Sequence, residues 1–95
     1  MITTKQRATL RGYANQLEVV VQIGKSGLTP TILKQVNDAL AAREMIKCKV
    51  LENAPVGPRE TAQELAEAAE CDIVQVIGSK FTLYKQNKKK PIYEI

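Results

Sequence analysis

Residues 21–30 read VQIGKSGLTP, and this stretch joins an expected strand to an expected helix. The residues that lead into it, 18–23, are rich in β-branched side chains and predict a largely buried strand. Thr29 can cap the helix and Pro30 suits its first turn, where the missing N–H of proline is tolerated. Apolar residues then recur with a helical period to about Arg43. The stretch therefore predicts a strand, a short loop and a capped helix.

The loop between these two elements is Gly24-Lys25-Ser26-Gly27, followed by Leu28 and Thr29. Two glycines permit positive backbone torsions and let a ligand approach without an intervening side chain. Loop amides and free N–H groups at the helix start can face an anion, and the helix dipole adds to the attraction. Since Lys25 supplies a mobile cation, the loop suits a phosphodiester.

The GxxG spacing alone is more typical of an ordinary turn between a strand and a helix. Two other phosphate-binding patterns are absent from the sequence: GxxxxGK followed by Ser or Thr, and GxGxxG. The setting of the loop, with its lysine and its capped helix, favours binding over mere connection.

Outward from this stretch, apolar periodicity predicts a first helix over residues 4–17, capped by Thr3 with Gln6. Residues 46–50 alternate apolar and basic side chains, which predicts a strand with Lys47 and Lys49 on its wet face. A turn-rich loop at residues 53–58 precedes a third helix with its apolar stripe over 62–69.

Two further strands are expected at residues 72–77 and 80–84, joined by the tight turn Gly78-Ser79. Tyr13 and Phe81 are expected in the core. Each helix needs a sheet face to cover its stripe, so the sequence predicts an α/β two-layer sandwich of order α-β-α-β-α-β-β with a four-stranded mixed sheet. Residues 1–95 form one domain, with 85–95 a basic C-terminal tail in which Pro91 argues against regular structure.

Charge is segregated along the chain, although the net charge is only +4. Both ends are basic, whereas residues 52–72 hold six acidic residues against Arg59. A separated positive field attracts polyanions, and nucleic acid is the commonest one in the cytosol. The candidate nucleic-acid-binding residues are therefore cations and loop residues: Gly24, Lys25, Ser26, Gly27, Leu28, Thr29, Lys5, Arg7, Arg11, Lys34, Lys88, Lys89 and Lys90.

The sequence gives no support for a metal-binding protein, an enzyme or a membrane protein. The chain has no histidine, and Cys48 and Cys71 lack metal-ligand spacing, so we expect no metal, no cofactor and no catalytic residues. No apolar run approaches the roughly 18 residues of a membrane span, and no signal-peptide pattern begins the sequence. We expect a cytoplasmic monomer with no small-molecule substrate and no membrane partner.

Several blocks in order resemble the YhbY family, the stand-alone bacterial CRM (chloroplast RNA splicing and ribosome maturation) domains. The blocks are Leu10-Arg11-Gly12 with Ala14, then residues 20–29, 40–50 and 74–78, and finally Leu83-Tyr84. This resemblance implies a fold similar to the C-terminal domain of translation initiation factor three. It also implies a GxxG loop used on RNA and association with ribosomal RNA in precursors of the large ribosomal subunit. KH domains have a similar GxxG loop, but there it joins two helices, whereas here a strand precedes it. The sequence therefore favours a CRM fold over a KH fold.

An alternative remains open at this point. The third helix carries Glu60, Glu64 and Glu67 on one face, and this acidic face could dock a partner protein while the basic ends serve solubility. Such an adaptor would bind RNA no better than a polycation of equal charge.

Overall fold

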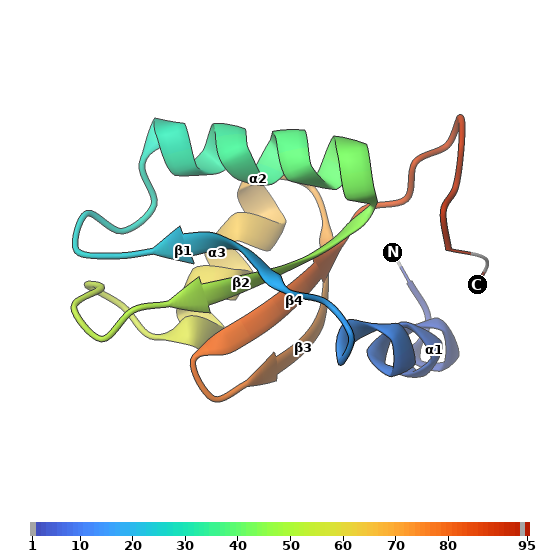
Figure 1. Ribbon diagram of the computed structural model, residues 1–95, viewed down its shortest axis with the longest axis horizontal. Helices are drawn as coiled ribbons and strands as arrows, with labels where there is room; N and C mark the ends of the chain where they lie inside the picture. Colours follow the sequence, from blue (N-terminus) through green and yellow to red (C-terminus); the bar gives the residue numbers. More distant parts are fainter. Residues whose placement is uncertain (1, 94) are drawn as a thin grey trace.

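The computed structural model describes residues 2–93 and 95. Its elements follow in the order α1 (Thr4–Ala14), β1 (Val19–Ile23), α2 (Pro30–Arg43), β2 (Met45–Val50), α3 (Pro58–Ala68), β3 (Asp72–Ile77) and β4 (Lys80–Tyr84). The predicted order of helices and strands is confirmed (Figure 1). One mixed sheet has the strand order β1-β2-β4-β3, in which β1 and β2 are parallel and the other pairs are antiparallel.

Local sequence sets the helix ends. In the capping box of α1, the Gln6 N–H donates to Thr3 Oγ1 at 3.1 Å and the Thr3 N–H donates to Gln6 Oε1 at 2.9 Å. At the start of α2, the Ile32 N–H donates to Thr29 Oγ1 at 3.1 Å. Helix α1 ends at Ala14, earlier than predicted, because residues 15–17 turn the chain towards β1.

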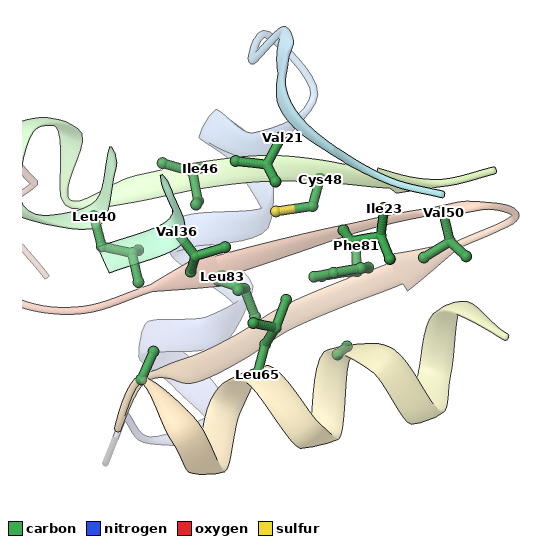
Figure 2. Packing of buried hydrophobic residues seen from close by; sticks show 12 residues of the cluster. Val21, Ile23, Val36, Leu40, Ile46, Cys48, Val50, Leu65, Phe81 and Leu83 are labelled. Carbon is green, nitrogen blue, oxygen red and sulfur yellow. The ribbon is translucent and has the colours of Figure 1, made fainter. Parts of the chain in front are cut away.

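The larger core lies between the sheet and the pair α2 and α3. Figure 2 shows Leu65 of α3 directed towards the strands, with Val36 and Leu40 of α2 beside it. The buried members of this cluster are Val21, Ile23, Val36, Leu40, Ile46, Cys48, Val50, Ala62, Leu65, Ala69, Phe81 and Leu83. The predicted burial of Phe81 and of the Cys48 thiol is confirmed.

Helix α1 lies on the opposite face of the sheet. Leu10 packs there with Met45, Val74 and Tyr84, which form a second, smaller core cluster. Met45 and its neighbour Ile46 thus face different cores, as expected for successive residues of a strand. The two-layer description applies to the larger core, and α1 covers one end of the other face.

The prediction that Tyr13 is a core residue is wrong. Its side chain is 47% exposed, and its ring meets that of Tyr93 at a centroid distance of 5.3 Å. The reason is the narrow contact of α1: its fully buried side chains are those of Leu10 and Ala14, so Tyr13 falls at the flank of the helix.

A buried glutamate organises the junction of α2, β2 and the C-terminal segment. Glu44 is the single residue between α2 and β2, its φ is 68°, and it is 0% exposed. Its carboxylate accepts three backbone N–H groups, from Asn87 at 3.0 Å, Ile92 at 3.1 Å and Tyr93 at 3.1 Å. Residues 85–93 contain no helix or strand, as predicted, yet this contact, which we call the Glu44 clamp, holds them against the fold.

Candidate nucleic-acid interface

The predicted loop is a tight turn at the carboxyl edge of the two parallel strands. The Gly27 N–H donates to the Gly24 carbonyl at 2.9 Å and closes the turn. Lys25 and Ser26 occupy its exposed tip. In Figure 1 the turn projects beyond β1 at one end of the long axis of the molecule. This arrangement presents a cation and a hydroxyl to solvent.

The two glycines have different roles in the turn. Gly27 is buried with φ +65°, and a Cβ at this position would lie 2.9 Å from Pro55 Cγ. Gly24 has ordinary torsions, and a Cβ there would stay 3.5 Å from Leu51 Cδ1. Only Gly27 therefore requires glycine, both for its torsion and for the approach of the 51–55 loop.

Backbone donors at this edge are fewer than the sequence suggested. Pro30 has no N–H, and Thr29 already accepts the N–H of Ile32, so the start of α2 is largely satisfied. In the described part of the chain, the N–H groups of Lys25 and Ser26 have no protein acceptor. An anion at the turn would thus meet these two amides and the Lys25 ammonium.

Two other predicted residues lie beside the turn but are already engaged. Leu28 is half-buried and packs against the larger core, which anchors the loop. Lys34 donates to Asp38 Oδ2 at 2.9 Å, and this is the one ion pair among residues 2–93 and 95. Both partners are largely exposed, so the pair is weak and Lys34 can exchange Asp38 for a phosphate.

The remaining predicted cations lie at the other end of the molecule. Lys5, Arg7 and Arg11 belong to α1, which lies opposite the turn along the long axis (Figure 1). Arg7 is half-buried and its Nε donates to the Ile73 carbonyl at 3.0 Å, which ties α1 to β3. The structure therefore separates the predicted cations into two groups, one at the turn and one at the opposite end of the long axis.

The lysine run joins the α1 group through the C-terminal segment. Lys88, Lys89 and Lys90 are exposed, and the N–H groups of Lys89 and Lys90 donate to Asn87 Oδ1 at 3.1 and 3.3 Å. The Glu44 clamp fixes both sides of this bend. The three lysines therefore stand on a defined backbone turn.

Sequence reasoning missed two cations close to the turn. Lys49 and Lys80 are paired directly across β2 and β4, and Lys49 also pairs with Gln22, two residues before Gly24. The alternation of residues 46–50 did indicate that Lys49 lies on the solvent-facing side of the strand. Its proximity to the loop depends on strand register, which the sequence pattern does not supply.

The described residues give little support for a reactive cysteine or a metal site. Burial raises the pKa of the Cys48 thiol to about 12 and that of Cys71 to about 11, so both stay protonated and poor as ligands at neutral pH. Within residues 2–93 and 95 no cluster of three His, Cys, Asp or Glu side chains could hold a metal. None of the helices described there has the length and apolarity to span a bilayer.

Comparison with known families and proteins identifies relatives of this chain. A family model of the CRS1 / YhbY (CRM) domain matches residues 2–85. The Bacillus subtilis protein named "Probable RNA-binding protein YqeI" is 37% identical over 95 residues, which is 100% of this chain and 99% of that protein. A Haemophilus influenzae protein named "RNA-binding protein" is 35% identical, over 96% of this chain and 92% of its own length.

A solved structure agrees over the whole chain. The solution structure of SAV1595 from Staphylococcus aureus, described as "a putative RNA binding protein", superposes with a TM-score of 0.85. The two chains are 39% identical, with 100% of this chain and 99% of the other covered. The fold derived above is thus found in an experimentally determined relative.

Proposed function

Because this chain belongs to the CRS1 / YhbY (CRM) domain family, we propose that it is an RNA-binding protein that grips the RNA backbone with its GKSG turn, residues 24–27. The names of its relatives in B. subtilis and H. influenzae support RNA as the ligand. The observation that carries the role of the turn is its geometry. Gly27 seats the turn against Pro55, and Lys25 and Ser26 are left exposed with free amides.

We infer further that the RNA is ribosomal RNA in precursors of the large subunit, as the likeness to the YhbY family implies. The protein would act there as a cytoplasmic monomer, by binding and not by catalysis, and without a cofactor. Few aromatic rings are available for stacking, so recognition relies on phosphates and RNA shape.

The group at the far end, Lys5, Arg7, Arg11 and the run 88–90, extends the footprint along the 36 Å axis of the molecule. Backbone contacts at both ends would fix the orientation of a structured RNA without reading its sequence. The exposed carboxylates of α3, Glu60, Glu64 and Glu67, lie on the helical side and repel RNA from it.

The test is a salt series of binding to a large-subunit ribosomal RNA fragment, comparing wild type with a Lys25→Glu, Ser26→Asp double variant. These positions are exposed, so the variant should fold as the wild type does, which circular dichroism checks. We expect an affinity loss of at least about tenfold, since charge-assisted contacts contribute about 1.5–3 kcal/mol each.

The matched control is Arg59→Glu together with Gln63→Glu on α3, which imposes the same charge change on exposed positions outside the turn. Equal losses in the two variants would mean that only net charge matters and would overturn the role of the turn. Wild-type binding no tighter than that of a polycation of equal charge would instead favour the adaptor that docks through α3.

A further inference from the structure

Half of one sheet face is left without a helix. On the face that carries α1, the helix covers the row that contains Met45 and Tyr84, and no described helix covers the two rows nearer the GKSG turn. In the nearer of these rows to α1, the short Thr82 side chain is nonetheless buried. Strand register defines these rows, which we call the open sheet face: Gln22, Lys49, Lys80 and Ile77 in one, and Lys47, Thr82 and Gln75 in the other.

The open sheet face concentrates positive charge. Lys49 and Lys80 are direct cross-strand partners, and Lys47 lies on the same face two residues from Lys49. Like charges in direct opposition destabilise a sheet. None of the three forms an ion pair with any carboxylate in the described part of the chain. An anion placed between Lys49 and Lys80 would convert this repulsion into attraction.

An unsatisfied hydroxyl lies at the base of the same face. Thr82 is 1% exposed, and its Oγ1 has no hydrogen-bond partner among the described residues. Buried polar groups are normally paired, so an unpaired one indicates a missing partner. Thr82 lines a hollow of about 230 Å³ whose other lining residues are Asn15, Lys47, Gln75, Ile77 and Lys80.

The hollow has a size and chemistry that suit a single base or ribose. Its volume lies below the roughly 300–1,000 Å³ of pockets for drug-sized ligands. Gln75 offers both a donor and an acceptor, and Ile77, 62% exposed, offers an apolar surface. A base in a duplex stays stacked and cannot enter such a hollow, whereas an unpaired base can be splayed out into it.

We propose that the open sheet face binds one unpaired RNA nucleotide, with its phosphate between Lys49 and Lys80 and its base or ribose over Thr82 and Gln75. This site rests on the proposed function and extends it, because the row of Lys49 and Lys80 includes Gln22, two residues before Gly24. The RNA strand would pass from the GKSG turn onto the sheet.

Two variants test the site with hexauridylate as the probe. Replacing Lys49 and Lys80 by glutamine should reduce the slope of log affinity against log salt by about 0.7, because the two lysines share one phosphate and each phosphate neutralised on a single strand contributes about 0.7. Thr82→Val keeps the side-chain shape and removes the hydroxyl. It should weaken binding about fivefold at an unchanged slope, with no loss of thermal stability.

The charge-matched control is Arg43→Gln with Arg59→Gln, two exposed positions outside both sites, and it should leave the slope unchanged. The proposal is overturned if Lys49→Gln with Lys80→Gln behaves like this control while the Lys25→Glu, Ser26→Asp variant loses affinity. It is also overturned if the slope of log affinity against log salt at the open sheet face is steeper for polyglutamate than for hexauridylate, because the face would then be a site for an acidic protein. Failure of the proposed function looks different, because wild type would then not bind hexauridylate or ribosomal RNA above a polycation of equal charge.

Discussion

Replacing Glu44 with glutamine should destabilise the whole domain, although the residue follows the end of α2 that is remote from the GKSG turn. The carboxylate accepts three backbone N–H groups of residues 87–93 at 3.0–3.1 Å. Hydrogen bonds to a charged group contribute about 1.5–3 kcal/mol each, which sets an upper bound of roughly 4.5–9 kcal/mol for the set. The real loss is smaller, because the segment can lift and hydrate its donors.

A neutral amide keeps the shape of the side chain, and its single oxygen can still accept at the position shared by Asn87 and Ile92. Its NH₂ group then faces the Tyr93 N–H, so one hydrogen bond is lost and two are weakened. We expect a decrease of about 2 kcal/mol in the free energy of unfolding, from a total of about 5–14 kcal/mol for a domain of this length. That corresponds to a melting temperature lower by about 8–16 °C.

The assay is urea unfolding followed by circular dichroism, with Glu52→Gln as the control because Glu52 is exposed. Amide hydrogen exchange gives a second readout, in which the N–H groups of Ile92 and Tyr93 should exchange faster in the variant. A stability within about 0.5 kcal/mol of wild type would refute the reasoning, since that range is typical of surface substitutions without a structural role.

Three other outcomes follow from features described above. Gly27→Ala should lower stability by about 1–3 kcal/mol in urea unfolding, because of its positive φ and the 2.9 Å approach of Pro55, whereas Gly24→Ala should change it by less than about 0.5 kcal/mol. Burial raises the pKa of the Cys48 thiol from 9.0 to about 12 and that of Tyr84 from 10.0 to about 12, with burial the main cause in each case. Because the unfolded chain ionises first, the contribution of these two groups to stability should be constant from neutral pH to about pH 8 and be lost progressively towards pH 12, and an alkaline titration by circular dichroism that shows no such loss would contradict the assignment. Tyr84→Phe removes the hydroxyl whose pKa is raised by burial and by the nearby Glu44 carboxylate, so the alkaline midpoint of the variant should be higher than that of wild type.

Local patterns predicted the elements well. The capping box at Thr3, the cap at Thr29 and the apolar alternation of residues 46–50 each depend on neighbours within a few positions, and the structure confirms all three. The Gly78-Ser79 turn is of the same kind, with Gly78 at φ +59°. Such features can be read from sequence because their physics is short in range.

Features that depend on distant contacts could not be predicted in this way. The burial of Glu44 is decided by partners 43–49 residues later, so the sequence alone does not distinguish it from a solvated glutamate. The exposure of Tyr13 depends on how α1 is rotated over the sheet. The juxtaposition of Lys49 and Lys80 depends on register, which is why these lysines were absent from the predicted site and the remote α1 group was included.

The Glu44 clamp also imposes an order on folding during synthesis. Domains form as the chain emerges from its N-terminal side, and β1, α2 and β2 are complete well before residues 87–93 exist. Until those residues arrive, the carboxylate between α2 and β2 must remain in water, because burying it without its donors is unfavourable. The GKSG turn and the loop that seats it can therefore form early on the nascent chain, while the junction of α2 and β2 closes last. A nascent chain would thus present its GKSG turn before it reaches its final stability.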